Sequence, residues 1–289
     1  MTTREIYDNG VDCLAQQGVD AAEAKTRVRL LLDQVTGVRY AHLMQPDAVL
    51  DEAAAHRVLN ALHAVAQGCP IPYITRQCEF YGLAFLCDKR ALIPRPETEV
   101  LVEAAVARLK DHPRPTIADL GTGSGCIAVS IAHALPRATI SATDVQADAL
   151  QLAHENAVRH GVADRVKLIE GSTQSWIEPL RREASERQFD AMLSNPPYIA
   201  TAAIANLQPE IRDWEPRSAL DGGSDGLDCY RPIAAYCGSS LRDDGFLMVE
   251  LGAGQFAAVE NIFHSAGWLV EPPLLDLAGI ARVLVARLR

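Results

Sequence analysis

The segment Asn195–Tyr198, with the sequence N-P-P-Y, has residue types suited to binding a planar amide or amino group. Its two prolines, Pro196 and Pro197, exclude a helix and hold the backbone extended. The side-chain oxygen of Asn195 and the carbonyl of Pro196 can each accept one hydrogen from an –NH2 group, and the Tyr198 ring can pack against that group's plane. A simple break between two elements is the alternative interpretation. We expect this segment to bind the amide or amino group of a substrate.

The chemistry that suits such a site is the transfer of a small alkyl group to the nitrogen of the bound amide or amino group. An amide nitrogen is a poor nucleophile because its lone pair is delocalised into the carbonyl. Two hydrogen-bond acceptors on its hydrogens return electron density to the nitrogen, and a fixed in-line geometry supplies most of the remaining acceleration. No separate general base is required before the transfer. The residues predicted to be catalytic are Asn195, Pro196 and Tyr198.

A glycine loop that follows Asp119 is the second candidate site. It lies between an apolar strand pattern and an amphipathic helix pattern, where open α/β sheets bind ligands. Its G-x-G-x-G spacing differs from the G-x-G-x-x-G of dinucleotide sites. We expect the carboxylate of Asp119, just before the loop, to lie beside the cationic amino-acid end of the bound ligand. A tight structural turn is the alternative. The predicted cofactor-binding residues in this loop are Gly121, Thr122, Gly123, Ser124 and Gly125.

Asp144 lies at the end of the next predicted strand. An acidic side chain in that position can accept hydrogen bonds from both hydroxyls of a ribose. The alternative is an acid that caps the following helix. Because the carboxylate would repel a ribose phosphate and no G-K-[ST] follows the loop, we expect a nucleoside without a triphosphate.

The pattern along the chain predicts an α/β protein with a doubly wound, mostly parallel sheet. Residues 1–68 are predicted to form a small helical bundle, residues 69–96 a linker with a β-hairpin, and residues 97–289 the domain with the sheet. The linker is too rigid and too polar between Ile93 and Glu99 to be only a passive tether. The strands are expected at 116–119, 138–144, 166–170, 189–194, 245–251 and 281–288.

Composition narrows the classes of function. The net charge of −10 argues against a protein that holds nucleic acid mainly through phosphate contacts. The seven cysteines include no C-x-x-C pair, which favours a reducing cytoplasmic location and no metal site. No apolar stretch reaches the about 20 residues that a membrane-spanning helix needs.

The glycine loop, Asp144 and the N-P-P-Y segment together resemble class I methyltransferases that act on exocyclic or amide –NH2 groups. Further segments are similar to those of the HemK-like release factor glutamine methyltransferases along nearly the whole chain. The related ribosomal-protein glutamine methyltransferases share N-P-P-Y, but the linker sequence I-P-R-P-E-T-E is more similar to the release factor branch. The segments that carry this resemblance are Glu79–Gly82, Ile93–Glu99, Glu215–Leu220, Asp221–Leu227 and Glu250–Gly252.

The resemblance implies a seven-stranded, Rossmann-like methyltransferase sheet with an N-terminal helical domain that docks the substrate. It also implies S-adenosylmethionine as cofactor, held by the glycine loop, Asp144, Ser172, Thr173 and Asn195. The N-P-P-Y segment would bind a glutamine of class-1 peptide chain release factors, whose methylation would modulate translation termination. Ser172 stands where the family usually has Asp, so adenine recognition there is expected to be weaker or water-mediated. Arg76 stands where Gly is common in the family, and the sequence assigns no consequence to this difference.

Two other functions are compatible with parts of this sequence. A nucleic-acid amino methyltransferase would use the same N-P-P-Y chemistry, but the chain is acidic and has no basic recognition domain. A module that binds a release factor without turnover is the non-enzymatic alternative, and the intact N-P-P-Y segment and glycine loop speak against it. We therefore expect a metal-free cytoplasmic enzyme with no direct contact to nucleic acid or membrane.

Overall fold

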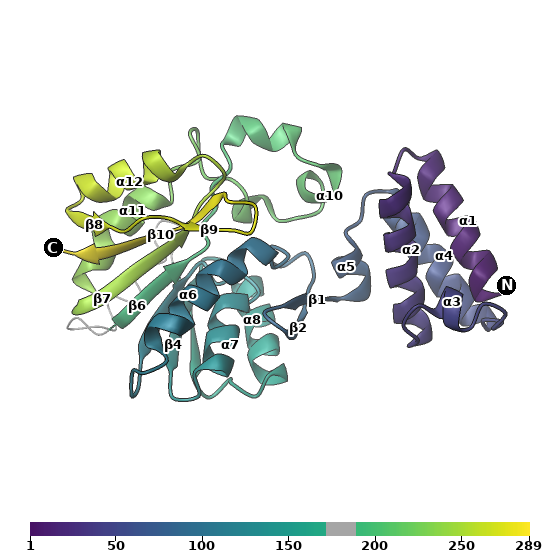
Figure 1. Cartoon of the computed structure of the whole chain (residues 1–289), viewed down its shortest axis with the longest axis horizontal. Helices are drawn as coiled ribbons and strands as arrows, with labels where there is room; N and C mark the ends of the chain where they lie inside the picture. Colours follow the sequence, from purple (N-terminus) through teal and green to yellow (C-terminus); the bar gives the residue numbers. More distant parts are fainter. Residues whose placement is uncertain (172–188) are drawn as a thin grey trace. The chain divides into compact units, whose positions relative to one another are not determined.

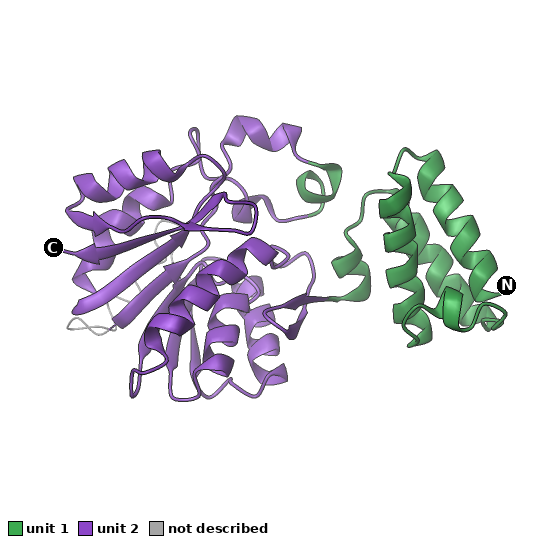
Figure 2. Cartoon of the chain, viewed as in Figure 1, with its two compact units in different colours: residues 1–77, 208–214 green, residues 78–207, 215–289 purple. Residues whose placement is uncertain are grey.

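The computed structural model describes residues 1–171 and 189–289. Within these residues no helix is both long and apolar enough to cross a membrane. The domain boundaries expected at residues 68 and 96 remain a prediction. The chain divides into two compact units (Figure 2): unit 1 is Met1–Gln77 with Gln208–Trp214, and unit 2 is Cys78–Leu207 with Glu215–Arg289.

Unit 1 is built from helices. The first begins with a capping box, in which the Glu5 amide donates to Thr2 Oγ1 at 3.2 Å and the Thr2 amide donates to the Glu5 carboxylate at 2.8 Å. The second ends at Gly37, whose φ of 69° suits a glycine. Apolar residues three and four apart meet in one buried cluster. The helices are α1 Thr3–Gln16, α2 Ala21–Thr36, α3 Ala41–Met44, α4 Glu52–Ala66, α5 Ile71–Thr75 and α10 Pro209–Arg212.

A β-hairpin follows α5, as predicted within residues 69–96. Strands β1 Gln77–Phe80 and β2 Leu83–Leu86 pair in a two-stranded sheet. The turn between them places Gly82 at a φ of 70°. Phe80 and Phe85 are buried with their ring centroids 5.9 Å apart, so the hairpin packs into the core of unit 2.

One mixed sheet forms the centre of unit 2 (Figure 1), and it confirms the predicted fold class. The strand order is β5-β4-β3-β6-β7-β10-β8, with the short β9 paired to β10. The first five strands in that order run parallel, whereas β10 is antiparallel to β7, β8 and β9. The strands are β3 Thr116–Leu120, β4 Thr139–Asp144, β5 Val166–Glu170, β6 Phe189–Ser194, β7 Leu241–Glu250, β8 Trp268–Val270, β9 Leu274–Leu275 and β10 Ala281–Leu288.

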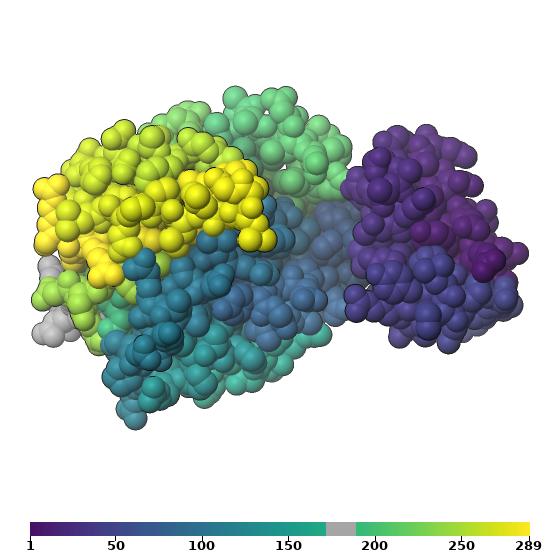
Figure 3. All heavy atoms as spheres, in the orientation of Figure 1, coloured from purple at the N-terminus to yellow at the C-terminus, as the bar shows by residue number. Residues whose placement is uncertain are grey.

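Helices cover both faces of this sheet (Figure 1). Successive strand residues point to opposite faces, so Ile117 packs in one apolar cluster and Ala118 in the other. The first cluster includes α6 Glu99–Leu109 and α7 Cys126–Ala134, beside which lies α8 Ala147–Arg159. The second includes α11 Tyr230–Tyr236 and α12 Phe256–Ser265. The C-terminal part of unit 2, yellow in Figure 3, forms a continuous stretch of surface in that view.

Candidate active site

A pocket opens at the carboxyl ends of the parallel strands of unit 2. The strand order reverses between β3 and β6, which is where open α/β sheets bind ligands. The pocket encloses about 730 Å³ of space, part of which is open solvent. Its lining comes from the segment before α6, the ends of three strands and the segment after α10. Residues from these parts are Arg90, Arg95, Thr98, Gly121, Thr122, Gly123, Ser124, Asp144, Asn195, Pro197, Pro216 and Ser218.

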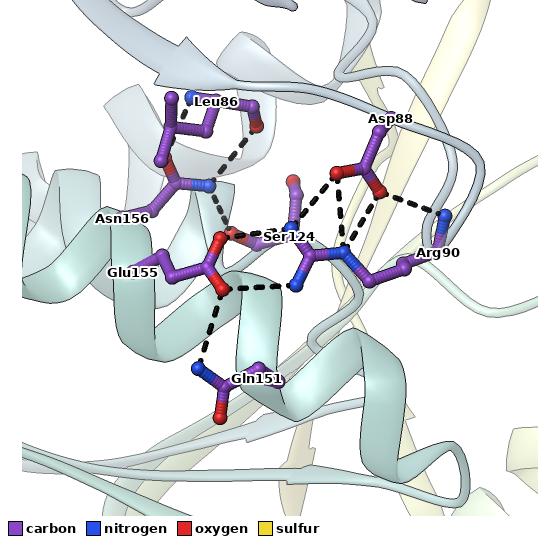
Figure 4. Close-up of polar contacts among 7 residues, drawn as sticks. All are labelled: Leu86, Asp88, Arg90, Ser124, Gln151, Glu155 and Asn156. Atoms are coloured by element: carbon purple, nitrogen blue, oxygen red, sulfur yellow. Dashed lines mark hydrogen bonds and ion pairs between the residues drawn. The ribbon is translucent and has the colours of Figure 1, made fainter.

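The glycine loop forms one wall of the pocket. Gly121 and Gly123 have φ values of 71° and 54°, which glycine adopts without a steric penalty. The carbonyl of Ser124 accepts a hydrogen bond from the buried Asn156 side chain at 2.9 Å (Figure 4). Gly125 does not line the pocket, because it packs against α8, where an added Cβ would lie 3.0 Å from Ala153 Cβ.

Asp119 lies beneath this loop, and its contact with a ligand's cationic amino-acid tail stays a prediction. Its side chain is completely buried and is not part of the pocket lining. It accepts a hydrogen bond of 2.6 Å from the Thr122 hydroxyl. Burial raises the pKa of Asp119 to about 7. The carboxyl group therefore holds the loop from below.

Asp144 is at the pocket, at the carboxyl end of β4. Its two oxygens accept hydrogen bonds from the Gly123 amide at 2.9 Å and the Gln146 amide at 3.0 Å. Burial raises the pKa of Asp144, while these amides favour its charged form. Each oxygen keeps a further lone pair. The side chain thus stabilises the turn before α8 and can still accept hydrogen bonds from a ligand.

The N-P-P-Y segment leaves β6 at the same edge of the sheet. Asn195 and Pro197 line the pocket, whereas Pro196 and Tyr198 are outside its lining. Tyr198 is turned toward Glu250, to whose carboxylate its hydroxyl donates at 3.4 Å. Burial raises the pKa of Tyr198, so its hydroxyl stays protonated.

The side-chain amide of Asn195 has a partner that the sequence did not predict. Its Nδ2 donates to Thr98 Oγ1 at 3.0 Å, and the Thr98 hydroxyl donates to Glu250 Oε2 at 2.6 Å. Thr98 and Glu250 are each 1% exposed. Both residues occur in segments that carried the family resemblance, but a threonine and a glutamate have no spacing signal that joins them.

The segment before α6 contributes basic groups to the pocket. Arg90 is held by Asp88 at 2.8 Å and by Glu155 on α8, also at 2.8 Å (Figure 4). These two carboxylates raise the pKa of Arg90. Arg95 forms an ion pair with the buried Glu215, whose other oxygen accepts from the Ile93 amide at 3.1 Å. The linker from Ile93 onward is therefore a wall of the site.

Two predicted cofactor residues, Ser172 and Thr173, lie outside the described residues, as does the predicted solvated helix around 181–187. Among the residues that the structure describes, no cluster of three or more His, Cys, Asp or Glu side chains is arranged to hold a metal ion.

Comparison with known proteins gives two family matches. The methyltransferase small domain matches residues 97–211, and the PrmC N-terminal domain matches residues 5–75. A release factor glutamine methyltransferase of Moorella thermoacetica is 42% identical over 99% of this chain and 98% of its own length. One of Cereibacter sphaeroides is also 42% identical, over 100% of this chain and 99% of its own length.

Solved structures share the fold at low sequence identity. The N-terminal domain of human METTL16, solved with SAH, is 18% identical over 82% of this chain and 83% of its own, with a TM-score of 0.52. A methyltransferase of Pyrococcus furiosus is 17% identical over 82% of this chain and 98% of its own, with a TM-score of 0.51. The methyltransferase domain match and these relatives, together with the sheet, place the chain among the class I methyltransferases. The chain belongs to the release factor glutamine methyltransferase family.

Proposed function

We propose that this chain transfers a methyl group from S-adenosylmethionine to the side-chain amide nitrogen of a glutamine in class-1 peptide chain release factors. The observation that carries the proposal is the side-chain amide of Asn195, which is fixed at the pocket by a hydrogen bond to Thr98. The names of relatives that are 42% identical over nearly the whole chain support the choice of substrate.

The pocket suits S-adenosylmethionine in its chemistry. Gly121 and Gly123 place no side chain in the pocket, so a ligand can approach their backbone closely, and Asp144 offers hydrogen-bond acceptors for ribose hydroxyls. We propose that Thr122, Ser124, Ser172 and Thr173 complete the binding residues. When bound, this molecule supplies an electrophilic sulfonium methyl group.

The chain's own residues then position the acceptor amide. Asn195 Oδ1 is the end of the side chain that is not bonded to Thr98, and it accepts one hydrogen of the glutamine –NH2 group. The Pro196 carbonyl accepts the other hydrogen, and the Tyr198 ring packs beside the group. Fixed acceptors of this kind typically contribute on the order of 10²–10³ in rate for each contact.

Unit 1 is proposed to dock the release factor, and the reaction is proposed to take place in the cytoplasm. All seven cysteines are free thiols, which supports a reducing compartment. The acidic net charge supports a protein acceptor rather than a nucleic acid.

The test is incubation of the purified protein with isotopically labelled S-adenosylmethionine and, in separate reactions, a release factor, DNA and RNA. Mass spectrometry of the products should find one added methyl group on a glutamine side chain of the release factor. Label in nucleic acid alone would favour the amino methyltransferase. A release factor that binds but gains no label would favour a module without turnover.

A further inference from the structure

The side chain of Asn195 ends a chain of hydrogen bonds that begins at a buried carboxylate. The Thr98 hydroxyl has one hydrogen, and the 2.6 Å contact assigns it to Glu250. The Thr98 oxygen can then only accept from Asn195, 3.0 Å away. Only the –NH2 end of an amide can donate, so this end must face Thr98 and the oxygen end must face away.

We propose that Glu250 and Thr98 are positioning residues that select glutamine as the acceptor by fixing which end of the Asn195 amide faces the pocket. This inference rests on the proposed function. With the oxygen presented, the site accepts a hydrogen from a glutamine –NH2 group. With the amide reversed, it would present a donor and favour the carboxylate of a glutamate.

The carboxylate is held so that its oxygens accept rather than donate. Thr98 and Tyr198 both donate to it, and Arg282 favours its charged form. Burial, the largest effect, and the charge of Glu97 act in the opposite direction and raise the pKa of Glu250 to about 7. Above this pH both oxygens of Glu250 are acceptors, as the chain of hydrogen bonds requires.

The surroundings give Glu250 little freedom to rearrange. The Tyr230 hydroxyl donates to the backbone carbonyl of Glu250 at 2.8 Å. Residue 250 also ends β7, where it pairs with Val283 of β10. A substitution that removes the acceptor oxygens of residue 250 should therefore change the hydrogen bonds of Thr98 and Asn195, because the backbone of residue 250 is held in place and cannot shift to compensate.

The test compares two peptides at pH 8, a glutamine peptide from a release factor and the same peptide with glutamate in place of that glutamine. Affinities are measured by calorimetry in the presence of S-adenosylhomocysteine. The parental protein should bind the glutamine peptide at least tenfold more tightly. Glu250→Leu removes the acceptor for the Thr98 hydroxyl at similar side-chain size and should reduce this preference at least tenfold.

Further variants separate positioning from loss of structure. Thr98→Val has the same shape without the hydroxyl and should also lose the preference at least tenfold, whereas Thr98→Ser restores the hydroxyl and should keep it. Glu97→Gln is the matched control, because it removes a neighbouring carboxylate outside the chain of hydrogen bonds, and it should keep the preference. Thermal melting of each variant identifies those that are folded.

The outcomes distinguish this inference from the proposed function. A parental protein that does not methylate the glutamine peptide or the intact release factor would count against the proposed function. A parental protein that methylates glutamine, together with a folded Glu250→Leu or Thr98→Val variant that keeps the parental preference, would overturn the inference alone.

Discussion

Two buried carboxylates lie on either side of the glycine loop and have different tasks. Asp144 is at the pocket and accepts from two backbone amides, whereas Asp119 is beneath the loop and accepts from the Thr122 hydroxyl. Their burial raises the pKa of both. At the scale of single residues, a substitution of Asp144 should therefore change ligand affinity, whereas a substitution of Asp119 should change stability.

Asp144→Ala should weaken the binding of S-adenosylmethionine by on the order of 1.5–3 kcal/mol, because hydrogen bonds to a charged group are lost. Isothermal titration calorimetry measures the change. Some stability should also be lost, since the Gly123 and Gln146 amides lose their acceptor. The titration must therefore be run on protein shown to be folded. An affinity equal to that of the parental protein would remove Asp144 from the cofactor site.

Asp119→Asn should change how stability depends on pH. A raised folded pKa means that the carboxyl group stabilises the fold below its unfolded pKa of about 4 and that this contribution is lost as pH rises through about 7. An asparagine cannot ionise, so the variant should gain stability relative to the parental protein between pH 4 and pH 8. The gain should be on the order of 1–4 kcal/mol, measured by denaturant unfolding.

A contrasting control is Asp213→Asn. The side chain of Asp213 is on the surface, where the hydrogen bond from Arg212 lowers its pKa. The folded state therefore favours the charged form, and this substitution should produce no gain as pH rises. If Asp119→Asn behaves in the same way, the assigned effect of burial on Asp119 is incorrect.

At the scale of elements, the segment after α10 supports the N-P-P-Y segment from outside the sheet. Ile199 and Asp221 form a bridge, in which the Gly222 amide donates to the Ile199 carbonyl at 2.8 Å. A Cβ on Gly222 would lie 2.8 Å from both the Pro197 oxygen and the Tyr198 Cα. A residue other than glycine would therefore push on the backbone of the site.

Gly222→Ala should lower turnover on glutamine at least tenfold and cost on the order of 1–3 kcal/mol of stability, the range for overpacked sites. Turnover is measured under saturating conditions per folded molecule. Gly279→Ala is the matched control, because Gly279 has a φ of 76° but no atom within 4 Å of an added Cβ. The control should lose stability and keep its turnover. Equal turnover in both variants would show that Gly222 does not position the site.

The sequence predicts an element well when its pattern lies within a few consecutive residues. The strands β5, β6 and β10 were predicted because the pattern of each lies in consecutive residues. The start of β7 at Leu241 rather than residue 245 was missed, since Arg242, Asp243 and Asp244 do not have a strand pattern.

The contacts of the site were harder to predict than its residues. Thr98 and Glu250 are 152 positions apart, and only the folded sheet brings them to Asn195. The direction of a side chain was also hidden, because an acid beside a glycine loop can face the ligand or the core. Asp119 faces the core. The residue types at the pocket were thus predictable, and their partners were not.

At the scale of the whole molecule, the proposed docking role of unit 1 gives a test on the intact substrate. Leu43 and Met44 are 66% and 72% exposed and adjacent on α3, and neighbouring exposed apolar side chains can mark a binding surface. The double substitution Leu43→Ser and Met44→Ser should lower kcat/KM at least fivefold for an intact release factor. Activity on a short glutamine peptide should stay within twofold, since the pocket is unchanged.

A double substitution in unit 2 serves as the control. Leu275 and Leu277 are 54% and 111% exposed, and replacing both by serine removes as many apolar side chains from another surface. This variant should methylate both substrates at parental rates. If the unit 1 variant loses activity equally on the intact protein and the peptide, α3 does not dock the substrate.

The bridge between Ile199 and Asp221 also bears on how such enzymes diverge. It closes the intervening segment at its base, four residues after Asn195, before the chain returns to β7. Lengthening a closed loop adds little entropic cost, about 0.6 kcal/mol for each doubling. Insertions at the exposed residues 201–203, away from the pocket lining, should thus be tolerated while Asn195 stays in place. Over evolution, this exposed part of the segment can be exchanged to change acceptor choice while the methyl-transfer chemistry is inherited intact.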